Sequence, residues 1–156
     1  MTAGIIRFAK PEEASILSEL AQRSKAYWGY DADFLASCKK ELTYNKSQLA
    51  SPTYCFQVAE LNSHNIIGFF ALNFLGSAHP ELEALFIDPD FIGQGWGITL
   101  LSAAIAAAKS RNATTIKLQS DPFAEAFYLA NGAVKVGETE SHSILGRFLP
   151  LLEICV

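Results

Sequence analysis

The sequence predicts one α/β domain whose central sheet has mixed strand directions. The chain has 156 residues, of which 50% are hydrophobic and 12% aromatic, so it can bury a core without a disulfide or a metal. Strand-type alternation and helical periodicity follow one another in the order β-α-α-β-β-β-α-β-α-β-β. We find no repeat, linker or low-complexity tract, which predicts a single domain over residues 1–156.

The elements of the first half are read from these periodicities. A strand over residues 5–8 precedes a helix that begins at Pro11, where a missing N–H costs nothing. The expected apolar face of this helix consists of Ile16, Leu17, Leu20 and Ala21. Asp31 or Asp33 caps a second helix. Strands are expected over residues 54–59, 66–72 and 81–87, and the middle one is apolar on both sides, as in a central strand.

The second half contains two further helices. The first follows a glycine-rich loop and ends near Arg111, with Ile98, Leu101, Ile105 and Ala108 on one face. After a strand over residues 114–118, Asp121 and Pro122 open a short helix. Its expected core-facing residues are Phe123, Phe127 and Ala130, and Gly132 suits the left-handed position after it. The last strands lie near residues 134–136 and 149–156, and an exposed final strand is a candidate surface for a homodimer.

The net charge and the N-terminal sequence limit which classes of partner and which compartment we expect. The net charge is −4, from 12 Lys and Arg against 16 Asp and Glu, which argues against nucleic acid because its partners usually present a basic face. The N-terminus lacks a basic region followed by an apolar run, so we expect no signal peptide. The longest apolar stretch, residues 66–75, is short of the ~20 residues of a membrane helix. We therefore expect a cytoplasmic protein without a membrane or nucleic-acid partner.

A metal site and a disulfide framework are both disfavoured. The cysteines, Cys38, Cys55 and Cys155, are odd in number and lack Cys-x-x-Cys spacing. The three histidines are scattered over probable loops. We therefore expect no metal.

Three glycines alternate in Gly93-Gln94-Gly95-Trp96-Gly97, between an expected strand and an expected helix. Such a loop exposes backbone N–H groups beside a positive helix end and suits a pyrophosphate, although a plain tight turn has the same pattern. A P-loop needs Gly-Lys-Ser/Thr where this chain has Gly97-Ile98-Thr99. Ile98 also stands where a dinucleotide fingerprint needs its third glycine, which disfavours a nucleotide-binding oxidoreductase.

Two blocks of the chain resemble the GNAT-type (Gcn5-related) N-acetyltransferases. Leu85-Phe86-Ile87-Asp88-Pro89, the glycine loop and Leu100-Leu101 resemble the acetyl-CoA motif, whose Arg/Gln-x-x-Gly-x-Gly/Ala core falls on residues 92–97. Residues 124–133, Ala-Glu-Ala-Phe-Tyr-Leu-Ala-Asn-Gly-Ala, resemble the family's Ala-x-x-Phe-Tyr-x-x-x-Gly-Phe segment. The order and spacing of both blocks are those of the family. Ile92 departs from the Arg or Gln of the motif, which removes one side-chain contact to the pyrophosphate.

This resemblance implies the GNAT fold, a central mixed and largely antiparallel sheet flanked by helices and splayed at the strand pair that binds CoA. It implies acetyl-CoA as the acetyl donor and an amine as the acceptor. The implied cofactor-binding residues are Leu85, Phe86, Ile87, Ile92, Gly93, Gln94, Gly95, Trp96, Gly97 and Ile98. Tyr128 matches the tyrosine that approaches the thioester sulfur in this family and acts as general acid.

Two acidic residues are candidates for the base. Glu81 and Glu83 lie two apart on one strand, so both carboxylates point to the same face. Members of the family often place a base or water-holding Glu near Glu81. Cleft burial and like charge would raise a carboxylate pKa toward a working range, whereas a solvated acidic strand end gives the same sequence.

Trp28, Tyr30 and Asp31 lie where the family places its acceptor loop. Aromatic faces and a carboxylate suit a cationic amine, although a loop packed into the core would look alike. Arg147 is a candidate contact to the acceptor or to CoA, or a surface arginine. The sequence thus predicts an N-acetyltransferase for a small cationic amine. The alternative is a non-catalytic acyl-CoA sensor on the same fold.

Overall fold

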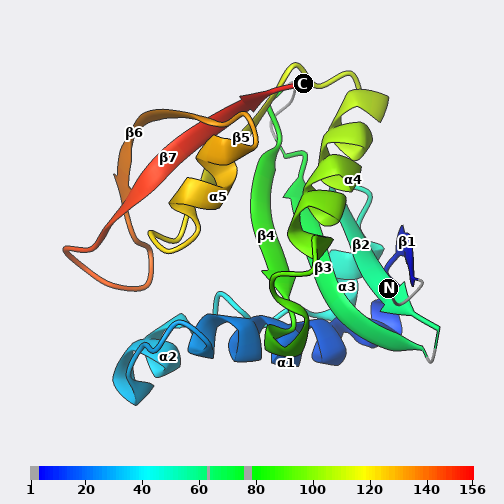
Figure 1. Cartoon of the computed structure of the whole chain (residues 1–156), viewed down its shortest axis with the longest axis horizontal. Coiled ribbons are helices and arrows are strands. Elements are labelled where there is room, and N and C mark those ends of the chain that lie inside the picture. The colour runs from blue at the N-terminus through cyan, green and yellow to red at the C-terminus, as the bar shows by residue number, and fades with distance from the viewer. Residues whose placement is uncertain (1–3, 63, 76–78) are drawn as a thin grey trace.

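The computed structural model describes residues 4–62, 64–75 and 79–156. Within them a mixed sheet has the strand order β1-β2-β3-β4-β5-β7-β6 (Figure 1). The strands are β1 (Gly4–Phe8), β2 (Tyr54–Leu61), β3 (Asn65–Asn73), β4 (Glu81–Ile87), β5 (Thr115–Gln119), β6 (Val134–Glu140) and β7 (Phe148–Cys155). Neighbouring strands pair antiparallel except β4 and β5, which run parallel. The predicted mixed, largely antiparallel sheet is confirmed.

Helices pack on both faces of this sheet. They are α1 (Ala14–Ala26), α2 (Ala32–Cys38), α3 (Lys46–Ala50), α4 (Trp96–Ser110) and α5 (Glu125–Ala130), with 3-10 turns at Pro11–Glu13 and Pro89–Phe91. One buried cluster joins α4 and α5 to β3, β5 and β7, and a second joins α1 and the end of α2 to β2 and β3. Each described helix is too short or too polar to cross a membrane. The five-residue helix α3 was not predicted.

The predicted apolar faces of α1 and α4 are only partly buried. Leu17, Leu20 and Ala21 of α1 are buried as expected, but Ile16 is exposed. Helix α4 buries Leu101 and Ala108 as expected and also Leu100 and Ala104, whereas Ile98 is 53% exposed. Helix α4 is apolar almost all round, so periodicity alone does not select its buried side.

Helix α5 begins later and faces differently than predicted. Asp121 caps a turn rather than the helix itself, since it accepts the N–H of Phe123 and α5 starts at Glu125. Phe123 and Ala130 are exposed, whereas Tyr128 is buried. Gly132, with φ of 98°, does adopt the predicted left-handed conformation after Asn131. Phe123 therefore lies in the turn before the helix, and the aromatic residue of α5 that is buried in the core is Tyr128.

The sheet splays between β4 and β5. Their ladder has one residue pair, Glu81 with Lys117, supported by a 2.9 Å hydrogen bond from the Lys117 N–H to the Pro80 carbonyl. Beyond this pair β4 runs on to Ile87 without pairing to β5. The splay implied by the resemblance is confirmed, and it leaves β4 with an open edge.

Candidate functional site

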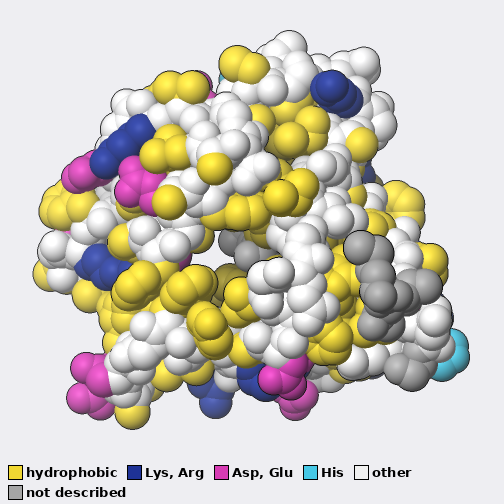
Figure 2. Space-filling view, in the orientation of Figure 1, with side chains coloured by type: hydrophobic (Ala, Val, Ile, Leu, Met, Phe, Trp, Pro, Cys, Tyr) yellow, Lys and Arg dark blue, Asp and Glu magenta, His cyan; other side chains and the backbone are white. Residues whose placement is uncertain are grey.

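The splay opens into a cleft of about 760 Å³. Figure 2 shows the molecule hollowed between α5 and α1, with hydrophobic side chains along the rim. Strand β4 runs through this cleft, because every residue from Glu81 to Ile87 lines it. The glycine loop borders one end of β4, and the two glutamates stand at its other end.

The glycine loop borders the cleft and leads into the first turn of α4. Gly95 is the N-cap of α4 and has a φ of 89°, which side-chain-bearing residues rarely adopt. A Cβ built on Gly95 would meet no atom within 4 Å, so this side of the loop is open. The N–H groups of the first helical turn have no partner within the helix. Six of the seven predicted loop residues line the cleft: Ile92, Gly93, Gly95, Trp96, Gly97 and Ile98. Gln94 lies between them and is not part of the lining.

Gly97 lets α4 approach α5 closely. A Cβ at this position would lie 3.2 Å from Cε1 of Phe127, tighter than most carbon contacts in proteins. Phe127 and Tyr128, which follow one another on α5, both line the cleft. The close approach therefore brings the start of α4 and the aromatic pair of α5 to one cavity.

Tyr128 is buried, with 7% of its surface exposed. Burial raises the pKa of its hydroxyl above the usual value of a tyrosine. The hydroxyl is therefore protonated at neutral pH and available as a hydrogen-bond donor. Its position in the cleft lining suits the predicted role.

Glu81 and Glu83 both line the cleft, as the strand period predicted. Glu81 is half-buried, and desolvation, followed by the like charge of Glu83, raises the pKa of its carboxyl. Glu83 is exposed and accepts a 2.9 Å hydrogen bond from Nδ2 of Asn73. Burial and like charge thus move the pKa of Glu81 toward neutral pH.

The predicted acceptor loop divides into three different environments. Trp28 lines the cleft and stacks on Phe123, with ring centroids 5.4 Å apart. Tyr30 stands behind the lining and donates a hydrogen bond to Asp121. Asp31 lies outside the lining: it caps α2 by accepting the Phe34 N–H at 2.8 Å. The structure thus brings Trp28 to the cleft and Tyr30 next to it, but not Asp31.

Replacing Asp31 by Ala should lower the free energy of unfolding by about 1 kcal/mol, the usual loss for an N-cap. Asp31→Asn should be nearly neutral, because Asn caps a helix as well as Asp does. We expect neither change to alter the KM of an amine acceptor. Thermal unfolding and steady-state kinetics of the two variants check this. A raised KM in Asp31→Asn at unchanged stability would instead place Asp31 in the acceptor site.

Asp121 is a residue at this site whose site position the sequence did not indicate. Its carboxylate accepts hydrogen bonds from Lys25 of α1, from the hydroxyl of Tyr30 at 2.9 Å and from the Phe123 N–H at 2.9 Å. Burial alone would raise the pKa of Asp121, but the hydrogen bond and charge of Lys25, helped by the Phe123 N–H and Tyr30, hold it below the usual value. The motif Ser-Asp-Pro predicted only a cap, because Lys25 lies 96 positions away in the chain.

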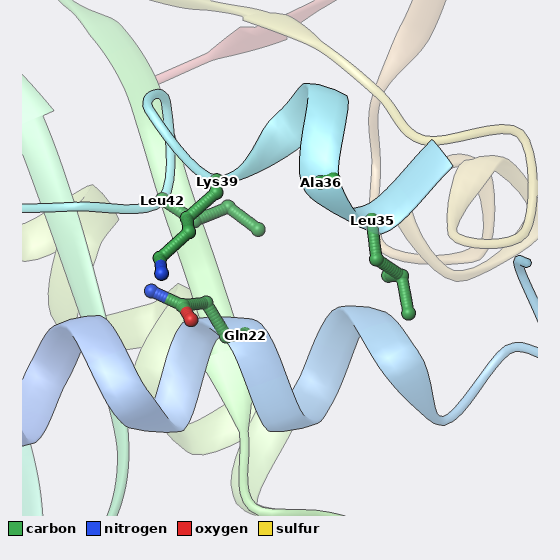
Figure 3. Close-up of a pocket in the computed structure, with 5 residues that line it drawn as sticks. All are labelled: Gln22, Leu35, Ala36, Lys39 and Leu42. Atoms are coloured by element: carbon green, nitrogen blue, oxygen red, sulfur yellow. The ribbon is translucent and has the colours of Figure 1, made fainter. Parts of the chain in front are cut away.

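A second, smaller pocket of about 260 Å³ lies between α1 and α2 (Figure 3). Its lining consists of Gln22, Leu35, Ala36, Lys39 and Leu42. The lining offers one charged group, the ammonium of Lys39, and no carboxylate, thiol or hydroxyl. The chemistry of the candidate site therefore resides in the cleft along β4.

Comparison with known proteins gives a consistent result. The model of the acetyltransferase (GNAT) family matches residues 17–133. An uncharacterized N-acetyltransferase of Methanocaldococcus jannaschii is 32% identical over 100 residues, which cover 60% of this chain and 44% of the relative. This chain therefore matches less than half the length of that curated relative.

Solved structures share the fold at low sequence identity. The PaiA N-acetyltransferase of Thermoplasma acidophilum, in complex with coenzyme A, is 20% identical with a TM-score of 0.78, and the match covers 99% of each chain. The ribosomal-protein-S18-alanine N-acetyltransferase of Escherichia coli is 18% identical with a TM-score of 0.72, covering 98% of this chain and 94% of that one.

Proposed function

Because this chain belongs to the acetyltransferase (GNAT) family, we propose that it moves the acetyl group of acetyl-CoA to the amine of a small acceptor. The observation that carries this proposal is the cleft at the splay, which joins a glycine loop, an open strand edge, a buried tyrosine and two carboxylates in one cavity. Each of these features supplies something that acetyl transfer requires.

Acetyl-CoA fits two parts of the cleft. The glycine loop, Ile92 to Ile98 with Gln94 included, would hold the pyrophosphate through main-chain N–H groups at the positive end of α4. This use of the main chain suits a loop in which Ile92 offers no polar side chain. The open edge of β4 at Leu85, Phe86 and Ile87 would hydrogen-bond the extended amide arm of the cofactor.

The chemical step needs an acid and a base. The acceptor nitrogen attacks the acetyl carbon as a neutral amine, so its ammonium form first loses a proton. The new C–N bond replaces the C–S bond, and the electron pair leaves with sulfur. Tyr128 donates the proton that the thiolate takes, and Glu81 or Glu83 accepts the proton that the amine loses, directly or through water.

The acceptor's amine would enter on the acidic side of the cleft. The face of Trp28 and the carboxylates of Glu81 and Glu83 attract an ammonium group, which supports a cationic amine. Tyr30 contributes to the site through its hydrogen bond to Asp121, which lines the cleft. Asp31, a helix cap, does not belong to it. Two expectations from the sequence, a cytoplasmic location and a homodimer, stay predictions. The expected dimer surface, an exposed final strand, is wrong, because β7 pairs with β5 on one side and with β6 on the other.

The pH profile of kcat/KM should identify the base. A carboxylate base loses activity as pH falls through its pKa, so Glu81→Gln should abolish the acidic limb of the profile. Glu83→Gln removes the like charge that helps to raise the pKa of Glu81, and the acidic limb should move to lower pH. If Glu83→Gln abolishes the limb and Glu81→Gln leaves it, the two roles are reversed. If neither changes it, the base lies elsewhere or the amine binds already neutral.

A CoA-release assay tests the proposed function directly. We would supply acetyl-CoA with polyamines, amino acids, aminoglycosides and peptides, and measure acetyl-CoA binding by calorimetry in parallel. Amine-dependent release of CoA is the expected result. Tight binding without release for every amine would favour the alternative, a non-catalytic acyl-CoA sensor. Absence of binding would overturn both.

A further inference from the structure

One part of the cleft, around Asp121, carries more positive than negative charge. Lys25 of α1 and Arg147 of the β6–β7 connection both line it, next to Asp121. Lys25 forms an ion pair with Oδ2 of Asp121, and Nη2 of Arg147 lies 3.6 Å from the same oxygen. The three side chains are 14%, 19% and 16% exposed for Lys25, Arg147 and Asp121. Two partly buried cations therefore share one carboxylate.

Other acids in the lining do not cancel this charge. Glu41 is exposed, where solvent screens its charge, and it forms no ion pair with a described residue. Glu81 and Glu83 belong to β4, whereas the contacts of Lys25 and Arg147 are with Asp121. The cleft thus has an acidic part at the start of β4 and a separate basic part at Arg147.

Arg147 is held in a fixed orientation. Its Nη2 donates a 3.0 Å hydrogen bond to the Tyr30 hydroxyl, and its guanidinium lies 4.7 Å from the centre of the Phe34 ring. Toward the rest of the described chain, Nε and Nη1 donate no hydrogen bond. A planar, oriented guanidinium with free donors is the group best suited to bind a carboxylate or a phosphate.

We propose that Arg147 binds an oxyanion of the acceptor, so that the acceptor carries a carboxylate or a phosphate together with its amine. This inference rests on the proposed function, because it places the amine at Glu81 and Glu83. Opposite charges at the two ends of the acceptor would then set its direction in the cleft. A phosphate of CoA is a less suitable partner, since the contacts of Arg147 are with Tyr30, Phe34 and Asp121 and not with the glycine loop.

Matched pairs of acceptors test the proposal. We would compare β-alanine with its amide, and phosphoethanolamine with ethanolamine, so that the two pairs distinguish a carboxylate from a phosphate. The wild-type protein should prefer the anionic member of one pair by about tenfold or more in kcat/KM, since one charged hydrogen-bonded contact is worth that much. Arg147→Gln should remove the preference, and Arg147→Lys should retain part of it.

Arg111→Gln is the control variant, because Arg111 is exposed, bonds the Pro52 carbonyl and lies outside the cleft lining. It should keep the wild-type preference.

The proposal would be overturned if the wild type had the same kcat/KM for both acceptors of each pair. It would also be overturned if Arg147→Gln lowered kcat/KM equally for both acceptors. A weaker acetyl-CoA affinity in Arg147→Gln would also overturn it, because Arg147 would then serve the cofactor. If Arg147→Gln fails to fold, Arg147→Lys provides the test. A preference for the anionic acceptor as large as that of the wild type would then contradict the proposal.

A binding measurement separates failure of this inference from failure of the proposed function. With CoA present, glutarate or inorganic phosphate should raise the melting temperature of the wild-type protein and of Arg111→Gln, but not that of Arg147→Gln. If this pattern occurs but no amine is acetylated, the anion site at Arg147 is supported and the proposed acetyltransferase function is refuted. If an amine is acetylated but the anions do not change the melting temperature, the proposed function is supported and the anion site is refuted.

Discussion

Replacing Tyr128 by Phe should lower kcat by about 10²–10⁴-fold, the usual contribution of a positioned acid. The change removes only the hydroxyl. The ring, buried among residues of the main core cluster, stays in place, and the melting temperature should change little. Because burial raises the pKa of Tyr128, the hydroxyl should keep its proton up to at least pH ~10, and its ionisation should not appear as a basic limb below that pH. Single-turnover measurements with saturating acetyl-CoA isolate the chemical step.

Tyr54→Phe provides the matched control for this experiment. Tyr54 is a half-buried tyrosine of β2 that lies outside the cleft lining, so its hydroxyl should not affect kcat. A Tyr128→Phe protein with wild-type kcat, measured where chemistry limits turnover, would mean that the thiolate leaves unassisted or takes its proton from water. Acetyl-CoA affinity should be similar in all three proteins.

Replacing Gly95 by Val should weaken acetyl-CoA binding by at least about tenfold, or ~1.4 kcal/mol. The new side chain would point into the open space beside the loop, where a Cβ meets no protein atom within 4 Å and where we place the pyrophosphate. Calorimetric titration with acetyl-CoA measures the effect. The variant also strains the backbone, since Gly95 has a φ of 89°.

Gly132→Val separates this strain from the lost contact. Gly132 has a φ of 98°, and a Cβ there also meets nothing within 4 Å, but it lies outside the cleft lining. Both variants should lose stability, and only Gly95→Val should lose affinity. If Gly95→Val does not fold, Gly95→Asn tolerates the left-handed conformation better and still places a side chain in the open space. Unchanged affinity in a folded Gly95 variant would refute pyrophosphate binding at this loop.

Several parts of the site were predictable because they depend on neighbours in the chain. The strand period places Glu81 and Glu83 on one face, and both do line the cleft. Alternating glycines before an apolar helix predict the loop that borders the cleft at the start of α4. Tyr128 was found through the family motif. Helical periodicity alone did not find it, because the periodicity predicted a core-facing Phe123, which the structure exposes.

Other parts depend on contacts between distant segments. Asp31 and Asp121 both have the local sequence of a cap, and both do cap a turn or a helix. Only Asp121 also accepts a hydrogen bond from Lys25, which lies 96 positions away in the chain. This contact between distant segments makes Asp121 part of the site. Arg147 had three possible roles in the sequence, and its hydrogen bond to Tyr30 spans 117 positions.

The sequence by itself determined the order of the elements apart from α3, the glycine loop, the pair of glutamates and, through the family motif, the aromatic pair that contains Tyr128. Each of these follows from residues within about two turns or one strand of one another, where spacing and backbone conformation are directly coupled. Only the tertiary structure decided the buried face of α4, the rotation of α5, the single-pair contact between β4 and β5, and the cluster of Lys25, Asp121 and Arg147. Those features arise when separate elements pack together, because an apolar residue then buries against whichever neighbour the fold supplies.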